Sequence, residues 1–122
     1  MQKKILVADD ASTFLKLEQT YLESKGYKVF MAGNGKEALE KLAAHKPDLV
    51  VLDLIMPEME GDQVCRLIKL NPQFKDIPVV MVTTKGDKKG EERCRKAGCN
   101  LFLTKPLRKS VFLDAVKQLL PD

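Results

Sequence analysis

Residues 50–61 read "VVLDLIMPEMEG", and this stretch decides the fold. It begins as an apolar run of the kind that forms a buried strand, and a carboxylate, Asp53, stands where the run stops. An ionised carboxylate in apolar surroundings is costly unless a cation or a hydrogen-bond donor pairs with it. A partner for Asp53 must therefore come from elsewhere in the chain.

The composition is that of one ordinary globular domain. The chain has 122 residues, of which 44% are hydrophobic and 31% charged, and we expect a single domain over residues 1–122. Its apolar stretches are too short to cross a membrane and no signal peptide is recognisable, so we expect a cytoplasmic protein without a membrane anchor. The three cysteines form no Cys-x-x-Cys motif, which favours reduced thiols packed on helices over metal ligands.

The basic balance of the chain is a weak indication of nucleic-acid binding. The net charge is +4, but basic residues are interleaved with acidic ones along the whole sequence. The densest basic segment, residues 85–98, has no helix-turn-helix pattern and no interleaved aromatic residues. We therefore expect no direct contact with nucleic acid.

Short strand-like segments alternate with segments of helical periodicity. The predicted strands are rich in β-branched or aromatic residues and cover residues 3–8, 27–32, 48–53, 77–82 and 100–104. The helix near 91–96 is the weakest, because its apolar face consists only of Cys94 and Ala97. Strict alternation predicts an α/β fold with a five-stranded parallel sheet and helices on both faces.

Polar side chains follow the ends of four predicted strands, namely Asp9, Asp10, Asp53, Thr83 and Lys105. Each has an ordinary explanation when taken alone: Asp10 could cap a helix, Thr83 could be a loop hydroxyl, and Lys105 a surface cation. In a parallel sheet, however, the carboxyl ends of all strands lie at one edge, where ligands bind. We therefore expect these side chains to meet.

The expected cluster suggests a metal site and phosphoryl chemistry. Three neighbouring carboxylates repel one another unless cations or protons relieve them, and an all-oxygen cluster with few protein ligands favours Mg²⁺ over Ca²⁺. A carboxylate such as Asp53 can attack a phosphoryl group to give an aspartyl phosphate. Lys105 and Thr83 could then contact the phosphoryl oxygens. No Walker A loop is present, which disfavours nucleotide binding.

The motifs "LVADD", "VVLDLIMPEMEG", "VVMVTT" and "LTKP", in this order, resemble the receiver domain of two-component response regulators over essentially the whole chain. The resemblance implies a flavodoxin-like (βα)5 fold with strand order 2-1-3-4-5. It implies Mg²⁺ bound by Asp9, Asp10 and Asp53 with the backbone carbonyl of Ile55. It also implies that Asp53 accepts a phosphoryl group from a histidine kinase or a histidine phosphotransfer protein.

The same resemblance implies roles for further residues. Thr83 would be the switch hydroxyl, Lys105 the phosphate-binding lysine and Phe102 the switch aromatic, although Phe102 fits a core strand residue equally well. The Lys105–Pro106 peptide bond would be cis. The downstream protein target would bind the surface of the fourth helix, fifth strand and fifth helix. Such a protein is a signalling domain that catalyses only its own phosphotransfer and dephosphorylation.

Two positions depart from the better-known chemotaxis pattern, Ile55 and Lys85. Family members often carry polar groups there that position the attacking water, so we expect slow hydrolysis of the phosphorylated form. Two other functions compete with this one. The presence of every acceptor-site residue argues against a phosphorylation-independent interaction module, and Ile55 leaves a haloacid-dehalogenase-like hydrolase without a general acid. The sequence does not decide whether the domain stands alone or belongs to a longer protein.

Overall fold

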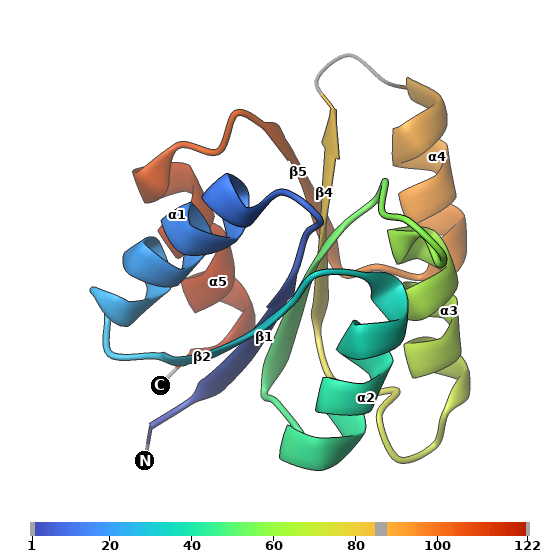
Figure 1. The fold of residues 1–122 in the computed structure, drawn as a ribbon, viewed down its shortest axis with the longest axis horizontal. Helices are drawn as coiled ribbons and strands as arrows, with labels where there is room; N and C mark the ends of the chain where they lie inside the picture. Colours follow the sequence, from blue (N-terminus) through green and yellow to red (C-terminus); the bar gives the residue numbers. More distant parts are fainter. Residues whose placement is uncertain (1, 85–87, 122) are drawn as a thin grey trace.

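The computed structural model describes residues 2–84 and 88–121. Within these ranges five strands alternate with five helices (Figure 1). The elements in chain order are β1 (Lys4–Ala8), α1 (Ser12–Glu23), β2 (Lys28–Ala32), α2 (Gly35–His45), β3 (Leu49–Asp53), α3 (Gly61–Leu70), β4 (Val79–Thr84), α4 (Lys88–Ala97), β5 (Leu101–Lys105) and α5 (Lys109–Leu119). No helix among the described residues is long and apolar enough to cross a membrane.

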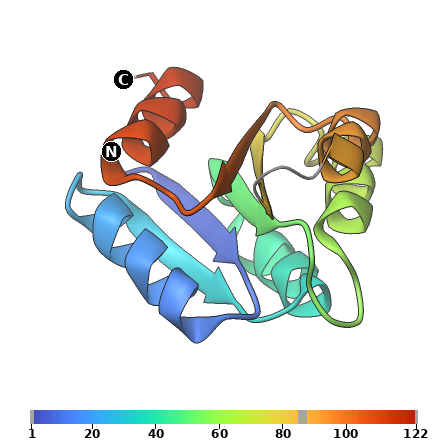
Figure 2. The ribbon, with the colours of Figure 1, turned by 90° about the horizontal axis from the view of Figure 1, so that it is seen from above.

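All strands pair in parallel, in the order β2-β1-β3-β4-β5. The predicted flavodoxin-like α/β fold is therefore confirmed. Helices α1 and α5 cover one face of the sheet, and α2, α3 and α4 cover the other, as the views in Figure 1 and Figure 2 show. Because the sheet is covered on both faces, its central strands must be apolar throughout.

Strand β3 is the centre of this arrangement. The side chains of its first four residues are fully buried, and they alternate between two apolar clusters on opposite faces of the sheet. Leu49 and Val51 pack in the cluster below α1 and α5, which contains Phe112. Val50 and Leu52 pack in the cluster below α2, α3 and α4, which contains Ile68. The only break in this apolar pattern is Asp53, at the end of the strand.

All five strands begin one or two residues later than the sequence predicts, and the largest differences are in β4 and β5. β4 begins at Val79 rather than residue 77, because Pro78 has no N–H to give to the ladder. It extends instead through Thr83 and Thr84, which pair with Thr104 and Lys105 of β5. The predicted first residue of the last strand, Asn100, lies before β5, where its side-chain oxygen accepts a hydrogen bond from Val79 N at 2.9 Å.

Particular residues mark several helix ends. Gly26 and Gly98 have φ values of +86° and +87°, the left-handed conformation common after a helix. Asn34 caps α2 by accepting a hydrogen bond from Glu37 N at 2.8 Å. The Glu37 side chain forms an ion pair with Lys41 at 3.4 Å. The Lys105–Pro106 bond is cis, as the resemblance implied.

Candidate functional site

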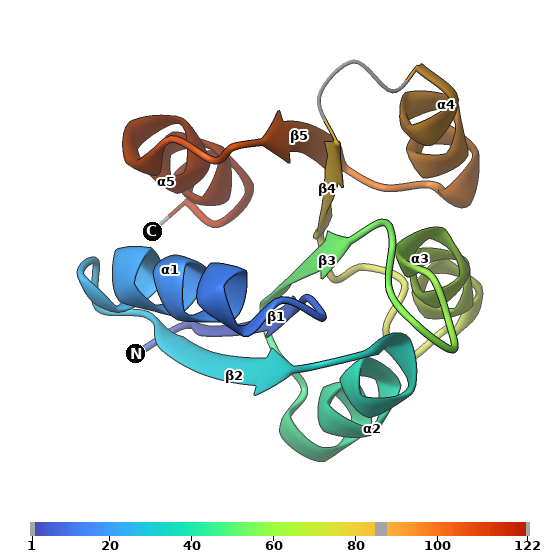
Figure 3. The same cartoon turned by 45° about the horizontal axis from the view of Figure 1, so that its top comes forward.

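Three carboxylates meet at the carboxyl edge of the sheet. Figure 3 shows this edge of the ribbon turned toward the viewer. Asp9 and Asp10 follow β1, and Asp53 ends β3. One oxygen from each lies within 4.8 Å of the others. Asp9 and Asp53 are buried, whereas Asp10 is exposed. Asp10 does not cap α1; the N-cap is Ala11, whose N–H donates to Asp9 Oδ1 at 2.9 Å. Two strands thus bring these acids together across the sheet.

Lys105, the last residue of β5, reaches across β4 to two of these carboxylates. Its Nζ donates to Asp9 Oδ2 at 3.0 Å and to Asp53 Oδ2 at 3.2 Å. The same ammonium lies 4.0 Å from the centroid of the Phe14 ring on α1, within cation–π range. The partner that the buried Asp53 requires is therefore Lys105, supplied by a residue 52 positions away in sequence.

The charges at this edge shift the pKa values of the groups that meet there. Burial, together with the negative charge of Asp9, raises the pKa of Asp53 to about 6, although Lys105 acts in the opposite direction. Burial disfavours the charge of Lys105, but the hydrogen bonds and charges of Asp9 and Asp53 outweigh it and raise the pKa of Lys105. One ammonium does not neutralise three carboxylates, so a further cation would stabilise the site.

Glu18 is a fourth acid near this site that the sequence analysis missed. It lies on α1 and is 1% exposed, and its Oε1 has no hydrogen-bond partner among the residues that the structure describes. Burial, and then the charge of Asp9, raises the pKa of Glu18 to about 8. The carboxyl group is therefore mostly protonated at neutral pH. The spacing of Phe14, Glu18 and Leu22 on one helix face was the signal that could have identified it.

The other predicted site residues occupy different environments. Thr83 is 1% exposed, and its Oγ1 lacks a hydrogen-bond partner in the described part of the chain. An unpaired buried hydroxyl is unusual, and a ligand oxygen would satisfy it. Phe102 on β5 is half-buried and packs against the apolar cluster below α4. Ile55 is 49% exposed. Lys85 lies outside the described residues.

The loop that carries Ile55 is held close to β3 by Gly61, the first residue of α3. Gly61 N donates to Leu54 O at 2.8 Å. A Cβ at this position would lie 2.3 Å from the carbonyl oxygen of Asp53, a distance that real Cβ contacts do not reach. The absence of a side chain at Gly61 therefore lets the start of α3 pack directly on the end of β3, which fixes the backbone of Asp53.

An ion-pair cluster joins the start of α3 to α4. The Arg93 guanidinium donates to Asp62 from Nε at 3.0 Å and from Nη2 at 2.9 Å, and also to Glu60 from Nη2 at 2.6 Å. The fork of the guanidinium matches the two carboxylate oxygens of Asp62. Since α4 buries only Gly90, Cys94 and Ala97, this cluster adds a polar attachment to a small apolar contact.

The donors of the acidic cluster fit a small divalent cation. They are carboxylate oxygens, which hard cations such as Mg²⁺ prefer. Three protein carboxylates leave room in an octahedral shell for water and for an oxygen of a ligand. The cluster is the one group of at least three potential metal ligands found among the described residues. The arrangement can therefore hold a cation beside a buried carboxylate, an ammonium and a hydroxyl that has no partner within residues 2–84 and 88–121.

Known proteins are similar to this chain in sequence and in architecture. Two curated relatives are the polar-differentiation response regulators DivK of Brucella anthropi, 34% identical, and of Brucella ovis, 33% identical. Each alignment spans 122 residues and covers 100% of this chain and 99% of the relative.

Solved structures agree with these relatives. A putative response regulator from Chloroflexus aurantiacus superposes with a TM-score of 0.96 at 29% identity and covers 100% of both chains. The chemotaxis protein CheY4 of Vibrio cholerae superposes with a TM-score of 0.91 at 26% identity, over 98% of this chain and 99% of its own.

The family model for the response regulator receiver domain matches residues 5–117, from β1 into α5. This range contains Asp9, Asp10, Asp53, Thr83 and Lys105. The chain therefore belongs to the response regulator receiver domain family, which binds Mg²⁺ at an acidic pocket and acts in two-component signalling.

Proposed function

We propose that this domain accepts a phosphoryl group on Asp53 from a histidine kinase or a histidine phosphotransfer protein, in a reaction that requires Mg²⁺. The observation that carries the proposal is the position of Lys105 Nζ, which lies 3.0 Å from Asp9 and 3.2 Å from Asp53. A cation that touches the acceptor carboxylate is well placed to touch a phosphoryl group attached to it.

In this reaction an Asp53 oxygen attacks phosphorus, the P–N bond to the donor imidazole breaks, and the imidazole takes up a proton. Lys105 donates to one phosphoryl oxygen, and the Thr83 hydroxyl, otherwise unpaired, donates to another. Asp9, Asp10, Asp53 and the backbone carbonyl of Ile55 would hold Mg²⁺. Bound there, the ion supplies further positive charge to the phosphoryl oxygens.

The domain would act as a switch and not as an enzyme on external substrates. One charge-assisted hydrogen bond from Thr83 is worth roughly 1.5–3 kcal/mol, which shifts a two-state equilibrium about tenfold to a hundredfold. A near-complete change requires about 5.5 kcal/mol. Contacts of Lys105, or a bound partner, would supply the remainder.

The output surface would consist of α4, β5 and α5, and its ligand would be a protein. A cavity of about 280 Å³ lies between β5 and the start of α5, and Phe102, Pro106 and Val111 are among its lining residues. Val111 is 45% exposed, which leaves an apolar side chain available to a partner. We place the domain in the cytoplasm, where such kinases and targets meet.

Phosphorylation of purified protein tests the proposal directly. With Mg²⁺ and a phosphorylated histidine phosphotransfer protein or acetyl phosphate, the intact mass of the native chain should increase by one phosphoryl group. Asp53→Asn should show no increase, and Asp114→Asn, which changes an exposed carboxylate on α5, should behave like the native chain. Equal labelling of Asp53→Asn would refute the assignment. Absence of labelling in the native chain would favour a phosphorylation-independent interaction module.

A phosphohydrolase with an aspartate nucleophile is the alternative to a phosphoacceptor switch. It would need an acid near Asp53 to protonate the leaving group, and the residue two positions later is the apolar Ile55. Sustained turnover of a phosphomonoester would support that function, whereas a single phosphoryl group retained per chain supports the switch.

A further inference from the structure

Two thiols meet at the end of α4, away from the acidic site. Cys94 is the fourth-last residue of the helix and fully buried, and Cys99 lies in the turn before β5 and is half-buried. The predicted position of the cysteines on helices is confirmed for Cys65 and Cys94 and is wrong for Cys99.

The helix ending itself brings the two cysteines together. Gly98 is left-handed, its N–H donates to Arg95 O at 3.1 Å, and Cys99 N donates to Cys94 O at 3.3 Å. These are the two hydrogen bonds of the Schellman motif, in which the side chains at the positions of Cys94 and Cys99 commonly contact each other. This places the two thiols on the same turn, close enough for each to shift the pKa of the other.

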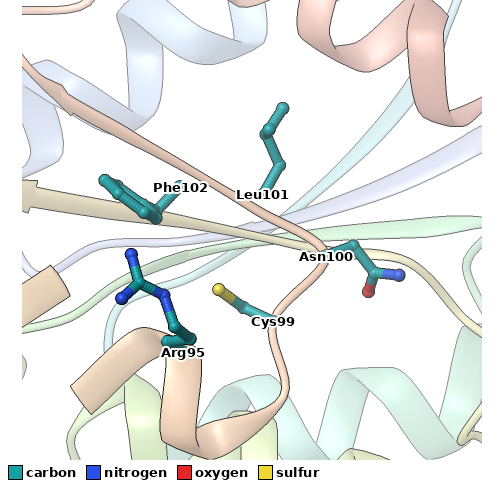
Figure 4. Close-up of a pocket in the computed structure, with 5 residues that line it drawn as sticks. All are labelled: Arg95, Cys99, Asn100, Leu101 and Phe102. Atoms are coloured by element: carbon teal, nitrogen blue, oxygen red, sulfur yellow. The ribbon is translucent and has the colours of Figure 1, made fainter. Parts of the chain in front are cut away.

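The surroundings of the two sulfur atoms differ. Cys99 lines a cavity of about 350 Å³ with Arg95, Asn100, Leu101 and Phe102. In Figure 4 the Arg95 guanidinium extends toward Phe102 and the Cys99 sulfur points toward the Arg95 side chain, while Asn100 points away. The interaction with the Cys94 thiol lowers the pKa of Cys99; burial opposes this shift, and the Leu101 N–H and the charges of Lys69 and Arg95 assist it. The same interaction, together with burial, raises the pKa of Cys94. One thiol is thus accessible and activated, and the other is a protected neighbour.

We propose that Cys94 and Cys99 form a redox-modification site, which a hydroperoxide oxidises reversibly to an intramolecular disulfide. The Cys99 thiolate attacks a peroxide oxygen and breaks the O–O bond, which gives a sulfenic acid and an alkoxide or hydroxide that takes a proton from water. The Cys94 sulfur then attacks the Cys99 sulfur and transfers its proton to the departing hydroxyl group, which leaves as water. The peroxide gains the two electrons that the two thiols lose, and a thiol reductant reverses the change.

Cys65 is the third thiol and serves as the internal comparison. It lies on α3 and is fully buried, and its Sγ contacts Ala97 O at 3.5 Å. Burial raises the pKa of Cys65 to about 12. A thiol that stays protonated is a poor nucleophile, so Cys65 should not compete with Cys99 for the oxidant.

The disulfide would join α4 to the start of β5. Cys94 is one of the three residues that α4 buries, so a covalent bond from it to Cys99 fixes the end of a weakly held helix. Amide hydrogen exchange in residues 92–99 should therefore be slower in the oxidised protein than in the reduced protein. Cys94→Ser treated with the same peroxide should not show this slowing.

Peptide mapping identifies the bond. Trypsin cleaves after Arg95 and Lys96, between the two cysteines, so only a Cys94–Cys99 disulfide holds the two resulting peptides together. After treatment with hydrogen peroxide, the intact native chain should lose the mass of two hydrogens. After rapid alkylation, its tryptic digest should contain this linked pair of peptides. Dithiothreitol should reverse both changes. The Cys65→Ser chain should do the same. A Cys65–Cys99 disulfide, a covalent dimer, or the absence of linked peptides would overturn the proposal.

Two further measurements keep the test independent of disulfide yield. Cys94→Ser should retain a sulfenic acid on Cys99 that dimedone traps, and Cys99→Ser should retain none. Arg95→Gln should slow the alkylation of Cys99 by iodoacetamide several-fold near neutral pH, whereas Lys96→Gln should not. Equal effects of these two variants, or a Cys99 that reacts no faster than a thiol in an unstructured peptide, would count against the site. Asp53→Asn should oxidise normally, which separates this proposal from the phosphorylation.

Discussion

Lys105 Nζ lies 3.2 Å from Asp53 Oδ2, and this pair joins the last strand of the sheet to its central strand. The ammonium is shared with Asp9, so it only partly offsets the burial of Asp53 and the repulsion between the two carboxylates. The net result is a pKa for Asp53 of about 6, above the ordinary value of 3.8. The acceptor carboxylate is therefore easier to protonate than a surface aspartate.

The first prediction concerns competition between protons and magnesium. Mg²⁺ requires the ionised carboxylate, so its affinity should fall as the pH decreases through about 6. Calorimetric titrations with Mg²⁺ across this range should show the change. Lys105→Met removes the positive charge that lowers the pKa of Asp53, so the midpoint of the fall in Mg²⁺ affinity should move to higher pH. Above that pH the variant should bind Mg²⁺ more tightly than the native chain. Lys16→Met, an exposed lysine on α1, should leave both unchanged. A midpoint in the ordinary aspartate range in the native chain would contradict the burial argument.

Glu18 gives a second prediction, on stability. Its pKa is about 8 when folded against an ordinary value of 4.5. Between these values the unfolded chain is ionised there while the folded chain keeps a proton, so the free energy of unfolding should fall as the pH rises, by about 1.4 kcal/mol per pH unit. This loss of stability is absent at pH values below the pKa of Glu18 in the unfolded chain and complete at pH values above its pKa in the folded chain.

Denaturant unfolding of Glu18→Gln at several pH values, with a chelator present, measures this contribution. The variant should lose most of the decline in stability across that window and should be more stable than the native chain at its alkaline end. Glu23→Gln, an exposed change on the same helix, should retain the decline. If Glu18→Gln also retains it, Glu18 does not hold a proton in the folded state.

These two acids show what could be predicted from the sequence and what could not. The meeting of Asp9, Asp10 and Asp53 followed from strand order, because parallel strands deliver their carboxyl ends to one edge. Glu18 was missed although Phe14 and Leu22 flank it at a spacing of four residues, because hydrophobic periodicity assigns a charged residue to the exposed face of a helix. The structure shows that α1 buries Glu18 together with Leu22.

Close contacts between segments were also beyond the sequence. The requirement for glycine at position 61 comes from a carbonyl oxygen of β3, and the partner of Arg93 lies 31 residues earlier, on α3. Neither contact is local, and neither leaves a repeating pattern in the chain. The boundaries of β4 also depended on pairing with β5, which the apolar run alone did not indicate.

The third prediction concerns the cluster of Arg93, Asp62 and Glu60. Arg93→Ala should lower the free energy of unfolding by only about 1 kcal/mol, since the guanidinium is partly exposed and screened by solvent. Its local effect should be larger: amide exchange in α4 should become faster, because little apolar surface holds this helix. Arg93→Lys should restore part of the protection, as it keeps the charge without the fork. Lys96→Ala on the same helix should alter neither, and equal exchange in Arg93→Ala would show that the cluster does not hold α4.

The fourth prediction concerns the lifetime of the phosphorylated form. Hydrolysis needs a water molecule aimed at phosphorus, and Ile55, 49% exposed and apolar, offers that water no hydrogen bond. Decay of the aspartyl phosphate should therefore be slow, and Ile55→Asn should accelerate it by about tenfold, the value of one added hydrogen bond of roughly 1.4 kcal/mol. Following the phosphorylated mass with time after removal of the donor measures both rates.

Ile55→Val is the matched control, because it changes the size of the side chain and adds no polar group. Its decay rate should equal that of the native chain, and the extent of phosphorylation should be similar in all three proteins, since the side chain of residue 55 is not proposed to take part in transfer. If Ile55→Asn and Ile55→Val decay equally, water is positioned by other groups and Ile55 does not set the lifetime. If both variants decay faster than the native chain, Ile55 acts by shielding the acyl phosphate from solvent and not by failing to orient water.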